Sequence, residues 1–583
     1  MTRALRGYLT RVTTTLRLPR MCLVFAVVAA GMPLMCPPSL FGQNRAEVPA
    51  HTEAPVFFEL FAASYSDSAN LDLFHKNKVR LIPLGIEAID GFDWRNHKRR
   101  DLSWWMRIED FKYLLPAINS GRGADARFVR DWFNHWYEIH EQDPQPNPGA
   151  QQPMTVGIRA MVLVRLLRAV EALEERDTQI EERLRETITE HRHFLELDEN
   201  FESRSNHGLW EAMGLFETAR VDHDTGTAGY ALRRMADVVE ASVSEQGIHR
   251  EHAAGYHFHV SRWLSEFVQY FASLGIDAWG DVEILADASG KMCGVSYYLF
   301  DHMGNIPQIG DTDARRVDPD SLSSAAEDRD PVLYDEDGGL AVYKDPPPSG
   351  LGRYLIFVTR QLSKLTLSLA HTHRDMLSVY FSCNGEVILG DGGRYEYGNS
   401  VSRRFFVSSA AHNTIVPIDK LDSTERIIGP IGGLPPRYSE QDGSVVFEGF
   451  MNSQLVYRRL TIPRDKSEFV VDDAISPEFD VVVLWNMGRD VVDISPQSIG
   501  EDDGREVHWW VVTTGKGRTF RLEVTLPPAV GGNEATIAMA KGAKYPMLGW
   551  YSPGYREMVP VTVLKITVRT PGGAIVRTKV TEQ

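Results

Sequence analysis

Apolar residues recur at helical spacing from about residue 50 to residue 320. The segment 158–170 is apolar apart from three arginines, and the segment 263–271 repeats the pattern. Such spacing predicts helices that are buried on one or on most sides. The breakers between these segments are 143–149, 222–229 and Gly275. We therefore expect antiparallel helices, arranged as a bundle or as an α/α toroid, between which periodicity does not distinguish.

Beyond about residue 320 the pattern changes to short alternating or β-branched runs between Gly, Pro, Asn and Asp. This texture predicts antiparallel strands and a β-sandwich of substantial size. Asn384-Gly385, between two such runs, predicts a hairpin with a type I′ turn. The expected fold is α+β multidomain, with a helical domain at 50–320 and a sandwich at 338–583. The segment 318–337, rich in Asp, Ser and Pro, is the expected linker.

The first 43 residues differ from the rest of the 583-residue chain. Several arginines precede an apolar run at 21–35, which is broken by Pro33 and is short for a membrane span. This arrangement predicts a signal peptide at 1–43 and export to the periplasm or beyond; the alternative is an uncleaved single-span anchor. A lipoprotein signal at Cys36 is disfavoured, because the bulky Met35 precedes it.

The formal net charge of -17 argues against nucleic acid as a partner. It does not exclude an anionic polysaccharide, because a local cluster of Arg, Lys and His can hold an anion whatever the charge of the whole surface. Beyond the predicted signal peptide the cysteines are Cys293 and Cys383. Two cysteines do not make a disulfide framework, and whether they pair is open.

Two histidines and later polar residues form the most informative pattern of the chain. His371 and His373 open an apolar segment that ends at Asp391, and His412 follows downstream. Two imidazoles and a carboxylate are ligand types that hold zinc or a similar divalent ion. Residues two apart in an extended segment share a face, so one histidine can turn to a metal and its neighbour to a cleft. The alternative is a polar strand end with surface histidines.

The predicted hairpin constrains how these residues meet. A two-residue turn at Asn384-Gly385 places Asp391 opposite Ser378 rather than opposite His373. If His373 and Asp391 share an ion, the His-Thr-His-Arg-Asp segment must therefore bend back or contain a bulge.

The helical half carries a second set of polar residues. Asn206-His207 lies in a helical context, and Tyr256 follows in Glu251-His-Ala-Ala-Gly-Tyr256. Together with His-x-His and the Asp eighteen residues after its second histidine, these motifs resemble the heparinase II/III-like polysaccharide lyases, including the related alginate lyases. The resemblance covers nearly all of the chain from Trp94 onward, and it implies an N-terminal α/α toroid followed by an antiparallel β-sandwich.

The resemblance also implies roles for the residues. Lyases of this kind remove the C5 proton of a uronate and expel the glycosidic oxygen from C4, which requires the neighbouring carboxylate to be neutralised. Asn206 and His207 match the neutralising pair, Tyr256 the catalytic tyrosine, and His371 the histidine across the cleft. Which of the last two takes the C5 proton depends on the epimer. A tyrosine is a usable acid, and becomes a base if nearby cations lower its pKa. Taken alone, the Asn-His pair is better interpreted as a helix cap and a satisfied core histidine, and Tyr256 as an aromatic core residue of a helix at 256–271.

By the same resemblance, a structural divalent ion falls to His373, Asp391 and His412. Zinc is the expected ion, and manganese or calcium are the alternatives.

The expected function is a secreted polysaccharide lyase that cleaves a uronate-containing glycan by β-elimination. One alternative is a glycoside hydrolase on a helical toroid, with Glu211 and Glu251 as its two carboxylates. Another is a non-catalytic glycan-binding protein that kept the fold. The sequence does not name the polymer, which could be of the alginate, glucuronan or glycosaminoglycan type. It leaves endo or exo action open, and a homodimer is one option for the assembly.

Other residues are weaker candidates. Asp311 and Asp313 lie in a segment that resembles the family near the domain junction, but a solvated loop explains them equally well. Four further residues could line anionic subsites, although a solvated surface is the favoured reading of them. They are Tyr395, Tyr397, Arg403 and Arg404. His257 and His259 are expected to pack rather than to bind a ligand.

Overall fold

A computed structural model of the chain describes most residues from 48 to 583. The described ranges are 48–65, 69–81, 84–88, 92–95, 102–173, 176–318, 329–346, 351–360, 371–421, 436–451, 455–477, 479–529 and 532–583. The predicted signal peptide at 1–43, its alternative as an anchor, and residues 319–328 of the predicted linker lie outside these ranges. In the ranges given, no helix combines the length and the apolar character that crossing a membrane requires.

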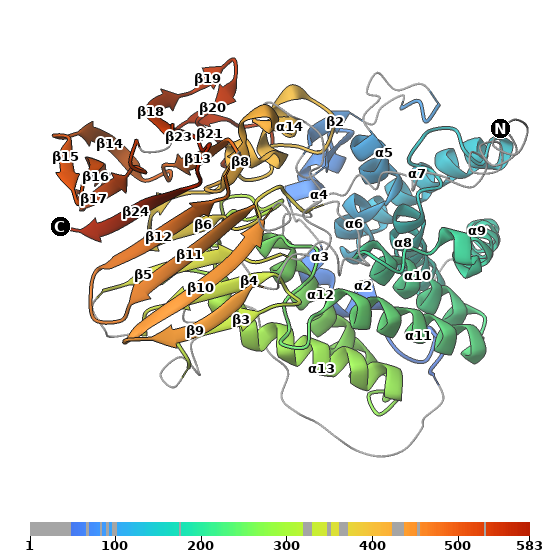
Figure 1. The fold of residues 1–583 in the computed structure, drawn as a ribbon. Helices are drawn as coiled ribbons and strands as arrows, with labels where there is room; N and C mark the ends of the chain where they lie inside the picture. Colours follow the sequence, from blue (N-terminus) through green and yellow to red (C-terminus); the bar gives the residue numbers. More distant parts are fainter. Residues whose placement is uncertain are drawn as a thin grey trace, which may run out of the picture.

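The N-terminal half is helical, as the apolar periodicity predicts (Figure 1). Its longer helices are α5 (Leu102–Glu109), α7 (Gly123–Gln142), α8 (Pro153–Glu171), α9 (Thr178–Glu196), α10 (His207–Val221), α11 (Thr225–Ser242), α12 (Ala254–Ser273) and α13 (Gly280–Val295). The shorter ones are α2 (Phe57–Leu60), α3 (Ala62–Tyr65), α4 (Ala69–Phe74), α6 (Leu115–Asn119), η1 (Lys112–Leu114), η2 (Asp198–Asn200) and η3 (Ser296–Leu299). A small hairpin of β1 (Lys78–Leu81) and β2 (Gly85–Ala88) interrupts them and was not predicted.

Local signals explain where several of these helices begin and how closely they pack. Asp177 and Asp224 cap α9 and α11 through side-chain oxygens, and proline stands in the first turn of α8. Helices α8 and α10 touch at two glycines: a Cβ on Gly214 would lie 2.4 Å from the carbonyl oxygen of Gly157. Larger residues at either position would push the two helices apart.

The C-terminal half is built from antiparallel sheets. Within the described residues, the largest has nine strands in the order β14 (Val491–Pro496), β16 (Arg505–Thr514), β17 (Thr519–Thr525), β24 (Ala574–Glu582), β12 (Glu468–Ile475), β11 (Val456–Pro463), β10 (Ser444–Met451) and β9 (Arg437–Gln441), with β15 (Gly500–Asp502) on β16. The second is β3 (Val332–Asp335), β4 (Leu340–Lys344), β5 (Arg353–Val358), β6 (Val379–Cys383) and β7 (Glu386–Leu389). The third is β18 (Glu534–Lys541), β23 (Thr562–Arg569), β13 (Val481–Asn486) and β8 (Ile415–Pro417).

Smaller elements complete this half. Two short ribbons pair β19 (Ala543–Lys544) with β20 (Met547–Leu548) and β21 (Trp550–Tyr551) with β22 (Val559–Pro560). The helical pieces are α14 (Val401–Val407), η6 (Ser409–Ala411) and η7 (Ile418–Lys420). The predicted fold class is confirmed: a helical toroid precedes an antiparallel sandwich.

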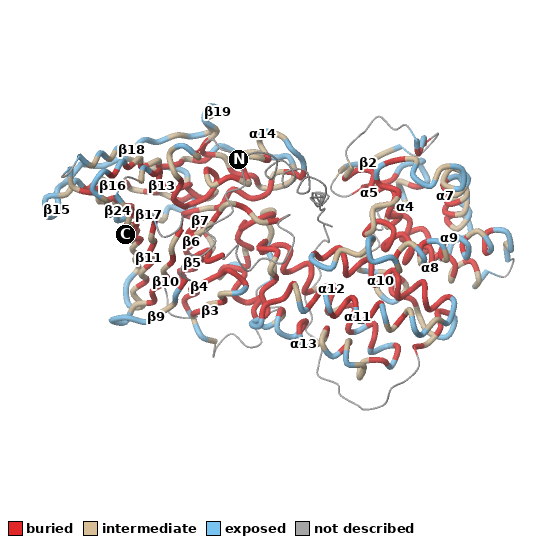
Figure 2. The backbone as a smooth tube through the Cα atoms, turned by 45° about the vertical axis from the view of Figure 1, so that its right-hand side comes forward, coloured by how far each residue is buried: buried red, intermediate tan, exposed pale blue. Residues whose placement is uncertain are grey.

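The five-stranded sheet is the middle layer of the molecule. Along β5, Leu355 and Phe357 face the nine-stranded sheet, where Phe357 stacks on Phe447 at a centroid distance of 6.4 Å. The alternate residues Tyr354 and Ile356 face the other way and pack on the helical half. Both faces are therefore buried, and Figure 2 shows buried backbone running through β4–β7 and through α10 and α12. Residues of the two halves meet along this outer face.

The predicted hairpin is present. Cys383 pairs with Glu386 and Ser382 with Val387, and the turn residues Asn384 and Gly385 have φ of 48° and 80°. Positive φ at both positions is what a type I′ turn requires. A register shift follows between Phe381 and Ser382, so the residue pairing predicted for a regular hairpin does not continue beyond that point. Cys383 is a buried free thiol, so it forms no bridge with Cys293.

Candidate active site

The four predicted catalytic residues come together where the helical half meets the sandwich. Asn206 and His207 stand at the start of α10, Tyr256 lies in the first turn of α12, and His371 follows β5 in the chain. All four are buried, with exposed fractions of 2%, 6%, 1% and 0%. Segments from both halves of the chain thus build one constellation.

Asn206 occupies the N-cap position of α10, but its side chain makes no capping bond. Its backbone N donates to Glu251 Oε1 at 2.8 Å, and its Nδ2 donates to Glu251 Oε2 at 2.9 Å. The helix-cap interpretation is therefore wrong for this side chain. Burial raises the pKa of Glu251, which His371 and Asn206 only partly oppose. Glu251 holds the amide in place, and one amide hydrogen of Asn206 is left for another acceptor.

His207 is a neutral imidazole in the free protein. Burial, with a smaller effect of His371 and Arg107, lowers its pKa to about 3. Its Nε2 is buried and has no hydrogen-bond partner within the described part of the chain. The sequence allowed His207 to act either as a cation or as a neutral hydrogen-bond donor. Because its pKa is lowered so far, the structure favours the neutral donor.

Tyr256 lies directly against His371. Their rings stack with centroids 3.7 Å apart and an interplanar angle of 22°, and the Tyr256 hydroxyl is 2.9 Å from that of Tyr397. Burial, and then Tyr397, raise the pKa of Tyr256 well above its usual value. Arg394 opposes this only in part. Tyr256 is thus protonated in the free protein and suited to donate a proton.

His371 faces a carboxylate on each side. Its Nδ1 is 2.9 Å from Asp311 Oδ2, and its Nε2 is 3.3 Å from Glu251 Oε2, without the geometry of a hydrogen bond. Asp311 is fully buried as well. Although burial opposes ionisation, Arg403 and the two histidines hold the pKa of Asp311 well below its usual range. Because an ionised carboxylate only accepts, His371 Nδ1 carries the hydrogen of that bond.

The predicted metal ligands form a compact buried group. One ligand atom each from His373, Asp391 and His412 can be chosen so that all lie within 4.8 Å of one another. His373 Nδ1 and His412 Nε2 are buried and have no hydrogen-bond partner among the residues that the structure describes. Asp391 Oδ2 lies 2.8 Å from His412 Nδ1. Two orphaned imidazole nitrogens beside a carboxylate fit a divalent cation, and the donor set suits zinc.

The segment after His371 bends back, as a shared ion requires. Residues 371–378 form turns rather than a strand, and Leu377 has a φ of 56°. Arg360 holds the bend through Asp375 and through the carbonyl of His252. His373 is thereby carried to Asp391, although the hairpin alone would not pair them.

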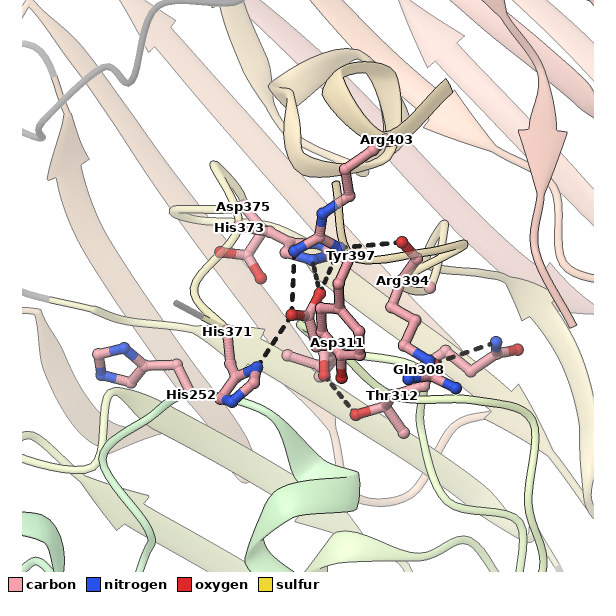
Figure 3. Close-up of polar contacts among 12 residues, drawn as sticks. His252, Gln308, Asp311, Thr312, His371, His373, Asp375, Arg394, Tyr397 and Arg403 are labelled. Carbon is pink, nitrogen blue, oxygen red and sulfur yellow. Dashed lines mark hydrogen bonds and ion pairs between the residues drawn. The ribbon is translucent and has the colours of Figure 1, made fainter. Parts of the chain in front are cut away.

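Several site residues were undervalued in the sequence. In the sequence, a solvated loop explained Asp311 as well as a functional role did. In the structure Asp311 is buried between His371, His373 and Arg403 (Figure 3). Arg403 and Tyr397 are buried too, so the prediction that they lie on a solvated surface is wrong for both. The signal that could have marked Asp311 was its place in a segment already resembling the family. Its three partners, however, are distant in the chain.

The remaining candidates pack around the site. His257 Nε2 lies 3.1 Å from the carbonyl of Met292, and His259 Nε2 lies 2.9 Å from Arg315 Nη1. These contacts agree with the expectation that both residues pack around or support the site and do not bind a ligand. Glu211, proposed in the hydrolase alternative, is buried in α10 and accepts from the backbone N of Glu202 at 2.7 Å.

Comparisons with known proteins agree with this architecture. Residues 336–579 match the family model described as heparinase II/III-like, C-terminal. A comparison with curated protein sequences found no match. The chain is similar in structure to a heparan sulfate lyase HepC mutant from Pedobacter heparinus, with 13% identity, a TM-score of 0.61, and coverage of 88% of this chain and 83% of that one. A structure of heparinase III gives 15% identity, a TM-score of 0.64, and coverage of 86% and 80%.

At these identities the structural likeness establishes the fold, which extends over both halves of the chain. The comparisons confirm the predicted resemblance to the heparinase II/III-like family: residues 336–579 match the model of its C-terminal domain, and the fold of both halves is similar to that of the two lyase structures.

Proposed function

We propose that the protein is a polysaccharide lyase that cleaves a uronate-containing glycan by β-elimination. The observation that carries the proposal is the stack of Tyr256 on His371, with Asn206 and His207 brought to the same place from α10. A proton donor, an imidazole and two amide or imidazole donors are the groups that this elimination needs.

In the proposed reaction, Asn206 and His207 donate hydrogen bonds to the carboxylate of the uronate. This lowers the cost of the negative charge that develops when the C5 proton leaves. His371 Nε2 accepts that proton, because its Nδ1 hydrogen is engaged by Asp311. Tyr256, protonated in the free protein, donates to the departing glycosidic oxygen. The C4–O bond breaks and a C4=C5 double bond forms, with no water consumed. This assignment of the C5 base applies to the uronate epimer whose C5 proton faces His371.

The similar structures favour one class of polymer. They are named as heparan sulfate lyase and heparinase III, so a glycosaminoglycan is the first substrate to test. The net charge of -17 makes local cations necessary for holding such a polyanion. Arg394 and Arg403 beside Tyr397 do not supply them, because both are buried and already paired with Asp313 and Asp311. Export through the N-terminal segment would give the enzyme access to extracellular glycans.

His373, Asp391 and His412 would hold a divalent ion, zinc by preference, with manganese or calcium as alternatives. When bound, the ion would supply structural support to the segment that carries His371. The proton transfers stay with Tyr256 and His371.

The test is a panel of purified polymers: heparan sulfate, hyaluronan, glucuronan and alginate. Elimination leaves an unsaturated uronate that absorbs in the ultraviolet, and sizing of the products separates endo from exo action. A hydrolase using Glu211 and Glu251 would shorten a polymer without that absorbance. Binding without any cleavage would favour the non-catalytic alternative and contradict the proposal.

A further inference from the structure

Asp311 is the residue through which the candidate metal cluster and the candidate catalytic histidine touch. Its Oδ2 lies 2.9 Å from His371 Nδ1, and its Oδ1 lies 2.8 Å from His373 Nε2. Arg403 clamps the same carboxylate with two nitrogens, Nη2 at 2.9 Å from Oδ2 and Nη1 on Oδ1. Figure 3 shows Asp311 between these three side chains. Each carboxylate oxygen therefore serves one histidine and one arm of the guanidinium.

These contacts fix which nitrogen of each ring carries the hydrogen. A carboxylate paired with arginine has no hydrogen to give, so both histidine nitrogens that face it must be donors. His371 then presents its Nε2 lone pair, and His373 presents its Nδ1 lone pair. His373 Nδ1 is the buried nitrogen that has no partner in the described residues. One side chain thus selects the basic atom of one ring and the ligand atom of the other.

The loop that carries Asp311 packs closely against the backbone at His252 and His371. Gly310 has a φ of +61°, and a Cβ there would lie 2.4 Å from the carbonyl oxygen of His252 and 2.9 Å from that of His371. Any other residue would displace the loop. On the other side, Thr312 Oγ1 accepts from the backbone N of Gly255 at 2.9 Å. Gly255 precedes Tyr256, so the loop is also tied to the start of α12.

We propose that Asp311 is a positioning residue that sets the tautomer and the ring orientation of His371 and of His373 together. The metal cluster and the proton-accepting imidazole then do not vary independently. The part of this inference that concerns turnover rests on the proposed lyase function. The part that concerns His373 does not.

The decisive variant is Asp311→Asn, measured for zinc affinity by chelator competition and for kinetics at saturating zinc. An amide can accept from one histidine, but it turns an N–H toward the other and loses the charge that holds Arg403. Loss of such an outer partner typically costs about 10- to 100-fold in metal affinity. We also expect kcat to stay at least about tenfold low with zinc saturating, while KM changes less than about threefold, because the base and not binding is affected.

A matched control is Asp345→Asn, which breaks another buried aspartate–arginine pair, with Arg353 at 3.0 Å. It should lower the melting temperature while leaving zinc affinity and kcat unchanged. Arg403→Lys is the second variant, because lysine keeps the charge but cannot clamp both oxygens. Arg403→Lys should lower zinc affinity and kcat as Asp311→Asn does, but by less. If Asp311→Asn does not fold, Arg403→Lys tests whether Asp311 positions the two histidines.

Unchanged zinc affinity in Asp311→Asn would overturn the coupling. So would full recovery of kcat on saturation with zinc, since His371 would then not depend on Asp311. A wild-type protein that cleaves no polymer would refute the proposed function alone, and zinc affinity would still decide whether Asp311 positions His373. A wild-type protein that binds no zinc would remove the inference altogether.

Discussion

In the proposed reaction, Tyr256 and His371 take different parts in the proton transfers because their surroundings differ, although their rings stack. Burial beside Tyr397 raises the pKa of Tyr256 and keeps its hydroxyl protonated. His371, by contrast, has its Nδ1 hydrogen directed at Asp311, which leaves Nε2 as the acceptor. An acid and a base can thus stand side by side at one pH.

Tyr256→Phe should remove most turnover and leave the fold intact, since the phenyl ring can keep its stack on His371. Loss of one proton-transfer group typically costs about 10² to 10⁴ in rate. The control is Tyr354→Phe, which removes another buried hydroxyl, bound to the carbonyl of Tyr298 at 2.8 Å. It should affect melting temperature more than kcat. If Tyr256→Phe kept activity within about threefold of wild type, Tyr256 would have no place in the mechanism.

His371 and His373, two positions apart, should respond in opposite ways to substitution. His373→Ala should lose bound metal and lower the melting temperature, because an ion that binds only the native state stabilises it. His371→Ala should keep the metal but lose activity, and any fall in its melting temperature should come from the lost packing and not from metal loss. Elemental analysis and thermal unfolding of both variants measure this. Equal metal loss in the two would mean that the two histidines are assigned wrongly.

At the scale of elements, the sequence predicted what local periodicity controls. Buried helices such as α8, and the hairpin at Asn384-Gly385, follow from apolar spacing and from turn chemistry. The β1–β2 hairpin was missed because each strand has only four residues and β2 buries none of them, which leaves too short an alternating pattern to detect. The partners of Asp311 were missed for a different reason. They lie 60 or more positions away, and only the packed fold brings them together.

Helix α10 carries a carboxyl whose burial makes stability depend on pH. Burial raises the pKa of Glu211 from 4.5 to about 8. In the unfolded chain the group ionises near its ordinary value. Between those two values the folded state therefore holds a proton that the unfolded state releases. The stabilising contribution is full below the unfolded pKa and is lost as pH rises through the folded one.

Glu211→Gln should remove this dependence. Between pH 5 and pH 8 the free energy of unfolding should fall more steeply for wild type than for the variant. The difference in slope should be up to roughly 1.4 kcal/mol per pH unit. Urea unfolding at both pH values measures it, and Glu182→Gln, an exposed position of α9, is the control. Parallel curves for wild type and Glu211→Gln would show that Glu211 stays ionised in the fold.

At the scale of the whole molecule, a buried lysine joins the two halves. Lys344 of β4 donates through Nζ to the carbonyls of Tyr297 and Phe300, each at 2.9 Å. Its ammonium also lies 3.9 Å and 4.0 Å from the centroids of those two rings. A single side chain of the sheet thus donates hydrogen bonds to two backbone carbonyls at the end of the helical half.

Lys344→Ala should weaken this joint more than it weakens either core. Each buried carbonyl left without a donor costs about 1–3 kcal/mol. Scanning calorimetry should show a lower first transition, with the two halves unfolding more separately than in wild type. Lys579→Ala, which removes a partly exposed lysine paired with Glu468 at 2.8 Å, should change little. An unaltered thermogram for Lys344→Ala would mean that the joint is held elsewhere.

The division of the site between two halves also limits how the chain can evolve. Asn206, His207 and Tyr256 belong to the helices, whereas His371 and the metal ligands belong to the sandwich. A gene rearrangement that exchanged either half for that of a distant relative would inherit half of the proposed reaction centre, with Asp311 from one parent and His371, His373 and Arg403 from the other. For the proposed lyase, selection for turnover would therefore act on both halves as one heritable unit, even though each has a hydrophobic core of its own.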